Sequence, residues 1–386
     1  MKQVYIIDYI RTPIAKFQGG LSEVRADDLA AIVLKEIVKR NPQIPAEEIE
    51  DVILGCANQA GEDNRNVARM ASLLAELPIK IGGETVNRLC ASGMAAIANA
   101  YRAIAIGEGD FYIAGGVEQM TRAPYVLSKS AQPFGRDVQL FDSSFGWRFV
   151  NPKMKELYGV DGMGETAENL AEIYKISREA QDEFALLSQQ KATSAQNSGR
   201  LAQEIVNVEI PQKKGEPKIF SEDEFVKPDT TLDKLAKLRP AFKKEGGSVT
   251  AGNSSGLNDG AAAMILASED AVKKYNLKPL AKIISSAVVG VEPRIMGIGP
   301  VEATKKALSR ANLSLEDMDI IELNEAFAAQ ALSVLQELGI DAKDERLNPN
   351  GGAIALGHPL GMSGTRIVGT AALELQKKNK KYALCT

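Results

Sequence analysis

Hydrophobic residues in the first part of the chain alternate between two spacings. A mostly apolar run at 4–10 is typical of a buried strand, and apolar positions at helical spacing over 27–40 predict an amphipathic helix. An acidic turn leads into a second strand at 49–56, and a small-residue helix over 91–109 precedes a strand at 110–116. This alternation predicts an α/β fold with a mostly parallel sheet covered by helices.

The same order of patterns returns after residue 280. Glu48 and Asp317 stand in matching acidic turns, and Cys90 and His358 each stand just before a small-residue helix start. The separation along the chain between Cys90 and His358 is nearly equal to that between Glu48 and Asp317. This agreement favours a duplicated fold. The second set of strands and helices is expected at 281–291, 301–311, 315–324, 364–378 and 381–386.

A stretch of different character separates the two sets. It has charged loops, several Pro and Gly turns and one clear helix pattern over 176–193. Insertions of this kind on a rigid α/β body often cover a site. We therefore divide the chain into a first half of 1–118 plus 250–271, an inserted loop domain of 119–249, and a second half of 272–386.

Composition narrows the class of protein. The chain has 386 residues, 45% of them apolar, and a formal net charge of −4 without a long basic run, so we expect no nucleic-acid partner. No apolar stretch is expected to reach transmembrane length, and the N-terminus has neither a signal nor a transit pattern. Three cysteines and one histidine argue against a disulfide framework and against zinc. We expect a cytoplasmic protein without a bound metal.

Cys90 is the first residue that could carry chemistry. It lies between a strand pattern and a helix pattern, in the stretch NRLCASGMAAI. The positive end of the helix is expected to lower the pKa of the thiol and to raise the thiolate fraction. The small neighbours Ala91, Ser92 and Gly93 allow a ligand to approach closely. A buried structural cysteine is the alternative, and the stretch by itself leaves both open.

His358 is the only histidine, in the stretch GHPLGMSGTR. A cysteine nucleophile needs a base that forms the thiolate or a cation that stabilises it, and imidazole can do both. Pro359 is favoured in the first turn of a helix, so His358 is expected at a helix start. Because His358 and Cys90 occupy equivalent places in the two halves, we expect them to face each other across one cleft. A core histidine is the alternative.

Two further stretches carry polar residues next to predicted strands. Asn324 and Glu325 follow a strand, where ligands bind in parallel sheets, and Asn324 could hold a water or stabilise an oxyanion. An N-cap is the alternative for Asn324. The loop at 250–260 concentrates Gly, Asn and Ser before an apolar strand, so an extended ligand could lie against its backbone.

Together these stretches resemble the thiolase family, and they cover most of the chain in the family's order. The loop GWRFVNPKMKELYGVDGMGETAEN further resembles the bacterial branch that cleaves 3-oxoadipyl-CoA. The pieces that resemble the thiolase family as a whole are RTPIAKFQGGL at 11–21, NRLCASGMAAI at 87–97, GGVEQMTRAPY at 115–125, MGETAENLAE at 163–172, the stretch at 238–264, EPRIMGIGPV at 292–301, NEAFA at 324–328 and the stretch at 348–366.

The resemblance implies two duplicated βαβαβαββ halves stacked as five αβαβα layers, with the loop domain over the site for coenzyme A. It implies a homodimer or homotetramer, with the segment 125–137 similar to the family's oligomerisation loop. It also implies acyl-CoA and CoA as substrates, with no permanently bound cofactor and no membrane partner.

The resemblance implies roles for individual residues. Cys90 would attack the keto carbon of a 3-oxoacyl-CoA, and free CoA would then take the acyl group in a ping-pong reaction. His358 would activate Cys90 and, with a water held by Asn324, stabilise the enolate oxygen of acetyl-CoA. Residues matching the binding site for coenzyme A and its acyl chain are Ser255, Ala251, Leu257, Phe242, Lys227, Lys234, Met163, Ala326, Phe327 and Met296.

The sequence departs from the family pattern in two places. Many relatives have His-Met where this chain has Gly162-Met163, which alters one contact to CoA. The family also uses a second cysteine, in a Cys-x-Gly loop, as an acid/base. We expect the sequence as given to stop just short of that cysteine, and we interpret Cys385 as a buried strand residue.

Other activities remain alternatives. Synthases with a Cys-His-His site are excluded because the chain has one histidine. A short-chain acetyl-CoA acetyltransferase that makes acetoacetyl-CoA, a cysteine hydrolase and a non-catalytic CoA-binding subunit stay open. Turnover that depends on CoA separates a thiolase from a hydrolase.

Overall fold

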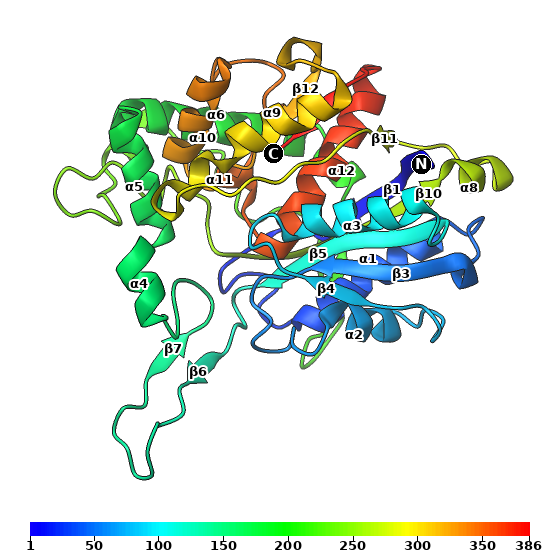
Figure 1. The fold of residues 1–386 in the computed structure, drawn as a ribbon, viewed down its shortest axis with the longest axis horizontal. Helices are drawn as coiled ribbons and strands as arrows, with labels where there is room; N and C mark the ends of the chain where they lie inside the picture. Colours follow the sequence, from blue (N-terminus) through cyan, green and yellow to red (C-terminus); the bar gives the residue numbers. More distant parts are fainter.

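The computed structural model describes residues 1–386 and is built around one large mixed sheet (Figure 1). Its strands follow the order β11-β1-β10-β5-β3-β4, and the short β2 pairs with β10. The strands are β1 (Val4–Arg11), β2 (Ala15–Lys16), β3 (Ile49–Gly55), β4 (Glu84–Val86), β5 (Phe111–Gln119), β10 (Asn258–Ser268) and β11 (Ala281–Ile283).

The outer face of this sheet is covered by α1 (Ala26–Arg40) and α2 (Val67–Leu74). The apolar side of α1 is buried against the sheet through positions such as Leu29, Val33 and Ile37, three or four residues apart. β5 and β10 are buried along their full lengths, as continuous apolar runs predict. The core of the first half thus lies between this sheet and two amphipathic helices.

The inner face of the sheet carries α3 (Ser92–Ile106) and α12 (Leu360–Lys378), which form the middle layer. Their first turns meet closely: a Cβ on Gly93 would lie 2.6 Å from Oγ1 of Thr365, and one on Gly364 would clash with the backbone of Met94. Only residues without a side chain allow this approach. The small residues of both helix starts therefore bring the segments before them, which hold Cys90 and His358, into one region.

The second half supplies a smaller sheet and an outer helical layer. β12 (Ile320–Glu322) and β13 (Ala383–Cys385) pair in parallel and contact α12. An apolar cluster of the second half joins Ile321 and Leu384 of these strands with Val301 and Leu335. These last two belong to α9 (Gly299–Ala311) and α10 (Ala328–Leu338). The layers thus follow the order α, β, α, β, α, as expected for the α/β class.

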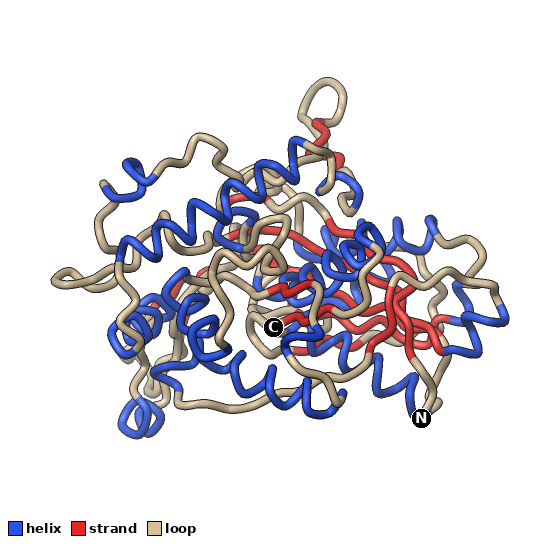
Figure 2. The backbone as a smooth tube through the Cα atoms, turned by 90° about the horizontal axis from the view of Figure 1, so that it is seen from above, coloured by secondary structure: helices blue, strands red, loops and turns tan.

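The segment 119–249 contains mostly short elements and one long helix, α6, and it lies against both halves (Figure 1). Seen from above in Figure 2, helices and loops surround the strands of the body. A hairpin of β6 and β7 projects from the body at the lower left of Figure 1. The elements here are β6 (Tyr125–Leu127), β7 (Leu140–Asp142), α4 (Pro152–Tyr158), α5 (Met163–Ile173), α6 (Arg178–Asn197), β8 (Val208–Ile210), β9 (Lys218–Phe220) and α7 (Leu232–Ala236).

The remaining elements are short. They include α8 (Glu269–Lys274), which contains the expected boundary between 271 and 272, and α11 (Ala353–Leu356). Four 3₁₀ turns span Ala46–Glu48, Leu201–Gln203, Pro293–Ile298 and Leu315–Asp317. The first and last of these are the two acidic turns that the sequence placed before β3 and β12.

A buried cluster of charges, the ion cluster, joins β1 to the loop domain and to α12. Arg11 donates through Nη1 and Nη2 to Asp223 at 2.7 and 2.8 Å, and through Nε to Glu204 at 2.7 Å. Arg200 pairs with Glu204 at 3.1 Å and with Glu374 of α12. None of the five side chains is more than 4% exposed. The cluster therefore ties the helix that follows His358 to the rest of the molecule.

Three expectations from the sequence are wrong. The large sheet is not mostly parallel: β10 runs antiparallel to both β1 and β5, because it enters from the long loop domain rather than through a short crossover. The strand expected over 281–291 is confined to β11, which pairs with the free edge of β1 at Val4–Ile6 instead of joining β12 and β13. Finally, Leu89–Ile106 is long and apolar enough to cross a membrane by length and composition alone, but this segment contains α3 of the middle layer.

Candidate active site

A cavity of about 1700 Å³ opens between the first half, the loop domain and the second half. Cys90, Asn324 and His358 all line it, although they come from three separate parts of the chain. Most of its lining residues are hydrophobic. A large apolar cavity with a few convergent polar groups is the usual form of a ligand site.

Cys90 lies in a tight turn just before α3. Leu89 has a φ of 49°, in the left-handed region that side chains rarely adopt, and Ser92 closes the turn. The hydroxyl of Ser92 donates to the carbonyl of Leu89 and accepts the backbone N–H of Arg88 at 2.8 Å. Left-handed backbone at a non-glycine residue stores strain that the surroundings must hold. The turn thus fixes the direction in which the thiol points.

The thiol of Cys90 is protonated at rest. Burial raises its pKa to about 12, and the nearby carboxylate of Glu118 contributes to this increase. The expectation that the helix start lowers this pKa is therefore wrong, because desolvation of the thiolate outweighs the helix dipole. A base is required before the sulfur can act as a nucleophile.

His358 has its unprotonated nitrogen at Nε2. Its Nδ1 lies 2.6 Å from Oγ of Ser363, and that hydroxyl donates its only proton to the carbonyl of Pro359 at 2.9 Å. Oγ must therefore accept the proton on Nδ1, which leaves Nε2 unprotonated. Burial, together with the positive charge of Arg366, lowers the pKa of His358 to about 4. The imidazole is thus a neutral base, and its backbone is anchored by Asn258 at 2.8 Å.

Asn324 follows β12 and faces the same imidazole. Its Nδ2 lies 3.3 Å from Nε2 of His358, to which it donates. Its Oδ1 is buried and makes no hydrogen bond within the chain. A buried amide oxygen of this kind needs a donor, such as a water or a ligand group. The geometry fits the expectation that Asn324 holds a water next to His358.

Glu118 was missed by sequence reasoning. It lies near the end of β5, is 2% exposed, and accepts the backbone N–H groups of Ala57, Asn58 and Gly361 at 3.0, 3.0 and 2.8 Å. Burial raises its pKa to about 7. It therefore joins the loop after β3 to the first turn of α12. The only sequence signal was an acidic residue inside an otherwise apolar strand.

Glu118 also belongs to a group of candidate metal ligands. Its carboxylate, that of Asp63 and the thiol of Cys56 lie within 4.8 Å of one another. Burial raises the pKa of Cys56 well above its ordinary value. Since the oxygens of Glu118 already accept three backbone donors and the Cys56 thiol donates to Asp63 at 3.7 Å, the group is occupied by internal hydrogen bonds.

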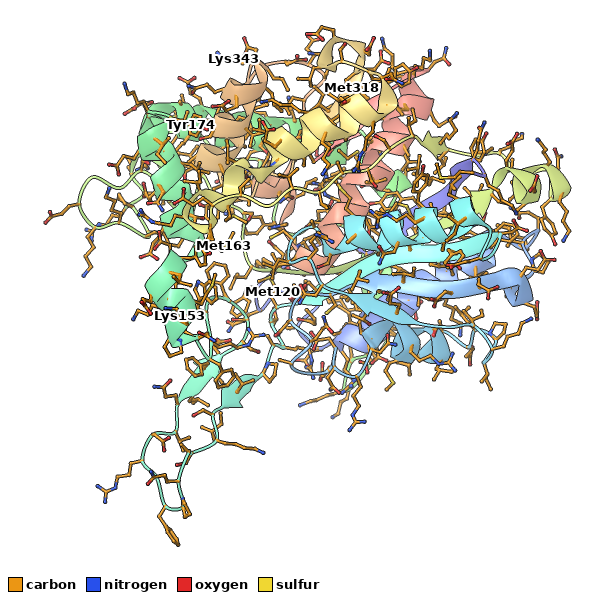
Figure 3. The ribbon with its side chains drawn as sticks, viewed as in Figure 1. Met120, Lys153, Met163, Tyr174, Met318 and Lys343 are labelled. Atoms are coloured by element: carbon orange, nitrogen blue, oxygen red, sulfur yellow. The ribbon has the colours of Figure 1, made fainter.

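The cavity brings together nine of the ten residues expected to bind the substrate. Ser255 donates its N–H to the carbonyl of Ala326 at 3.0 Å, so the two expected loops lie side by side. Figure 3 places Met163 and Met120 between the loop-domain helices and the end of the large sheet. The nine are Ser255, Ala251, Leu257, Phe242, Lys227, Met163, Ala326, Phe327 and Met296.

Lys234 is the exception. It does not line the cavity, and its ammonium pairs with Asp229 at 2.5 Å. Lys227 does line the cavity, and its ammonium lies 4.5 Å from the ring centre of Phe225. Cys385 lies in the strand β13 as expected, but it is only partly buried and lines the cavity; its thiol contacts the carbonyl of Ile367 at 3.7 Å.

The fold and the site define an enzyme class. A protonated thiol, a neutral imidazole and a buried amide line one apolar cavity that is large enough for an extended ligand. These groups can form a thiolate, receive an acyl group and stabilise an oxyanion. Such chemistry is that of a cysteine-dependent acyltransferase.

Comparisons with known proteins give the family. Residues 4–270 match the thiolase N-terminal domain and residues 277–386 match the thiolase C-terminal domain. The chain is 58% identical to the 3-oxoadipyl-CoA/3-oxo-5,6-dehydrosuberyl-CoA thiolase of Escherichia coli strain K12, covering all of this chain and 96% of the relative. It is also 58% identical to a beta-ketoadipyl-CoA thiolase of Acinetobacter baylyi, with the same coverage.

Solved structures agree. The acetyl-CoA acetyltransferase of Bacillus anthracis superposes with a TM-score of 0.92 at 42% identity, over 100% of this chain and 96% of that one. The human mitochondrial 3-ketoacyl-CoA thiolase in complex with CoA gives 0.90 at 41% identity, over 99% and 93%. The chain belongs to the thiolase family and has its fold. It is an acyl-CoA:CoA C-acyltransferase.

Proposed function

We propose that Cys90 carries the acyl group in the thiolase reaction of this chain. Nε2 of His358 takes the thiol proton, and the sulfur attacks the keto carbon of a 3-oxoacyl-CoA. The bond between the keto carbon and the adjacent CH₂ breaks, which leaves an acyl-Cys90 and the enolate of acetyl-CoA. The proton removed from the thiol balances the one gained by the acetyl carbon. CoA then takes the acyl group in a second step, and the condensation is the reverse.

Stabilisation of charge is assigned to the same few groups. The enolate oxygen accepts a hydrogen bond from His358, once this residue is protonated, and from a water held by Asn324. The backbone N–H of Cys90 binds the oxygen of the acyl group. Donors fixed in advance at such positions typically contribute about 10²–10³-fold in rate. The single observation that carries the proposal is a neutral His358, with Nε2 unprotonated, in the cavity that holds a protonated Cys90.

The proposed substrate is 3-oxoadipyl-CoA, with acetyl-CoA and succinyl-CoA as its products. Support comes from the printed activities of the relatives at 58% identity. A short-chain acetyl-CoA acetyltransferase is the second candidate. It is favoured by the B. anthracis structure and by an acetyl-CoA acetyltransferase of Chromobacterium violaceum at 47% identity.

The pantetheine arm of CoA is proposed to lie along Ser255, Ala251, Leu257, Phe242, Ala326 and Phe327, with Met163 and Met296 near the acyl chain. Phe242 and Phe327 pack edge to face at 6.0 Å, which gives this channel a rigid aromatic wall. Lys227 is proposed at the nucleotide end, where a cation complements the phosphates. Lys234 is left out because it pairs with Asp229.

A homodimer or homotetramer in the cytoplasm is also proposed. The β6–β7 hairpin supports the oligomer because it projects from the body and exposes large apolar side chains, among them Tyr125, Leu127, Phe134 and Leu140. Exposed apolar groups in one place favour association. Light scattering of the purified chain tests this, and replacing Leu127 and Phe134 by Ser should lower the mass by a whole number of subunits.

The central proposal is tested by intact mass after mixing with acetyl-CoA, acetoacetyl-CoA or succinyl-CoA. One added acyl group in the wild type, absent in Cys90→Ser, is expected. An adduct that persists in Cys90→Ser, or no adduct from any donor, contradicts the assignment. Production of acetyl-CoA only when free CoA is present with a 3-oxoacyl-CoA separates thiolysis from hydrolysis.

A further inference from the structure

The cavity wall next to Glu118 carries an unpaired positive charge. Arg148 lines the cavity, is half-buried, and belongs to the loop between β7 and α4. Its guanidinium donates to Oδ1 of Asn58 at 3.1 Å and to the carbonyl of Ser143 at 3.4 Å. Both acceptors are neutral, and Arg148 forms no ion pair within the chain. Because arginine stays protonated, the wall presents a cation without a counter-ion.

Arg148 is connected to the reacting groups by a short chain of hydrogen bonds. Asn58, which accepts from Arg148, donates its own N–H to Oε1 of Glu118 at 3.0 Å. Oε2 of Glu118 accepts the N–H of Gly361, three residues after His358, at 2.8 Å. The guanidinium thus sits on the part of the wall that Glu118 links to the start of α12.

The proposed substrate has an anionic group close to its reacting carbon. In a 3-oxoadipyl chain, three C–C bonds separate the keto carbon from the terminal carboxyl carbon, so the two lie roughly 4 Å apart. The carboxylate therefore enters the cavity near the reacting carbon. A carboxylate in an apolar cavity is costly unless it is paired, and a guanidinium can bind it with two hydrogen bonds.

We propose that Arg148 binds the terminal carboxylate of a dicarboxylic acyl chain and so selects this substrate class over uncharged chains of equal length. The inference rests on the proposed function of Cys90. Asn58 and the carbonyl of Ser143 hold the guanidinium in place before the substrate arrives. A preorganised charge loses less freedom on binding than a mobile one.

The other cations of the cavity fit this role less well. Arg88 and Arg102 also line it, but both are exposed. The Arg88 side chain makes no hydrogen bond within the chain, and that of Arg102 bonds only to Asn99 of its own helix. Lys227 stacks on Phe225, on the side proposed for CoA. Lys282, Lys380 and Lys381 lie at the end of the cavity next to β11 and β13.

The test uses two donors that differ only at the end of the chain. Succinyl-CoA and butyryl-CoA carry four-carbon acyl groups, one ending in a carboxylate and the other in a methyl group. In each case the Cys90 sulfur replaces the CoA sulfur on the carbonyl carbon, and the thiol proton leaves on CoA. The rate of acylation is followed by intact mass in the wild type, Arg148→Gln, Arg148→Lys and, as a matched arginine of the same cavity, Arg88→Gln.

Arg148→Gln is expected to slow succinylation on the order of 10- to 100-fold, the usual contribution of a hydrogen bond to a charged group, with butyrylation within about threefold. Arg148→Lys should recover part of the loss, and Arg88→Gln should not change the ratio. Equal slowing with both donors would mean that Arg148 only braces the wall, and unchanged rates with both donors would place the carboxylate elsewhere. If the wild type accepts butyryl but not succinyl groups, the thiolase proposal stands and this inference fails. If it accepts neither, the role of Cys90 fails first.

Discussion

The molecule buries two groups of polar side chains, one made of paired charges and the other of uncharged groups. In the ion cluster, Arg11, Arg200 and three carboxylates pair with one another through short, mostly bidentate or shared contacts. In the reaction centre, Cys90 and His358 are uncharged, and the amide oxygen of Asn324 has no partner within the chain. Both groups are close to α12, since Glu374 lies in that helix and His358 lies just before it.

The difference shows how burial can serve stability or chemistry. Charges removed from water must be paired, and the ion cluster meets this condition by joining β1, the loop domain and α12. The reaction centre instead avoids buried charge, because its cysteine and histidine are both neutral. This leaves a thiol and a base ready to exchange a proton. A saturated cluster holds the parts together, whereas an unsaturated one can bind and react.

The largest expected effect is at the base. In His358→Asn, a thiol with a pKa of about 12 has no acceptor for its proton, so acylation of Cys90 by acetyl-CoA should slow by roughly 10²–10⁴-fold. The rate is measured by intact mass over time, and the melting temperature serves as a control for folding. An unchanged acylation rate would show that His358 is not the base.

A similar substitution in the ion cluster should affect stability. Glu204→Ala leaves Arg11 and Arg200 with fewer partners in a dry environment and is expected to cost about 3–5 kcal/mol in the free energy of unfolding. Urea unfolding measures the change. Glu76→Ala, which removes an exposed pair with Lys35, is the matched control and should have a much smaller effect. Equal costs would mean that the cluster is not specially stabilising.

The neutral histidine also predicts a dependence of stability on pH. Its pKa is about 4 in the folded state and about 6.5 in an unfolded chain, so the unfolded state binds the extra proton between these values. The stability due to neutral His358 is therefore present above pH 6.5 and is lost as the pH falls toward 4. The total is about 3 kcal/mol.

Raised carboxyl pKa values, such as those of Glu118 and Glu322 at about 7, act in the opposite sense over the same range. The histidine contribution is therefore isolated as the difference between the wild type and His358→Gln in urea unfolding at about pH 4 and about pH 7.5. If the two proteins lose stability in parallel, the imidazole is not buried in its neutral form.

The smallest effect is expected at Cys385. Its thiol contacts the carbonyl of Ile367, and burial raises its pKa far above the ordinary value, so it is a poor acid or base here. Cys385→Ser should change the acylation rate of Cys90 by less than roughly threefold, or under about 0.7 kcal/mol. A loss above roughly tenfold would give this cysteine a role in proton transfer.

Local patterns predicted much of the molecule. The strands β1, β3, β5, β12 and β13 and the helices α1, α3, α6, α9 and α12 lie where hydrophobic spacing placed them. Pairing was harder to predict. The antiparallel insertion of β10 and the attachment of β11 to β1 depend on which edge is free once the chain has folded.

Residue chemistry alone raised Cys90, His358 and Asn324 as candidates beside structural alternatives, and the resemblance to thiolases assigned their roles. Residue chemistry did not indicate Glu118 or Arg148, whose significance comes from contacts with residues 57, 58 and 361. It also gave the wrong direction for the pKa of Cys90, because it counted the helix dipole and could not count burial.

The sequence by itself therefore determined the positions of most main strands and helices and the candidate reactive residue types, which follow from periodicity and side-chain chemistry. Only the tertiary structure decided that Cys90 is a thiol, that Nε2 of His358 is unprotonated and that Arg148 faces the cavity without a counter-ion. The physical reason is that protonation and pairing depend on desolvation and on neighbours far apart in the chain, which come together only when α3 and α12 meet.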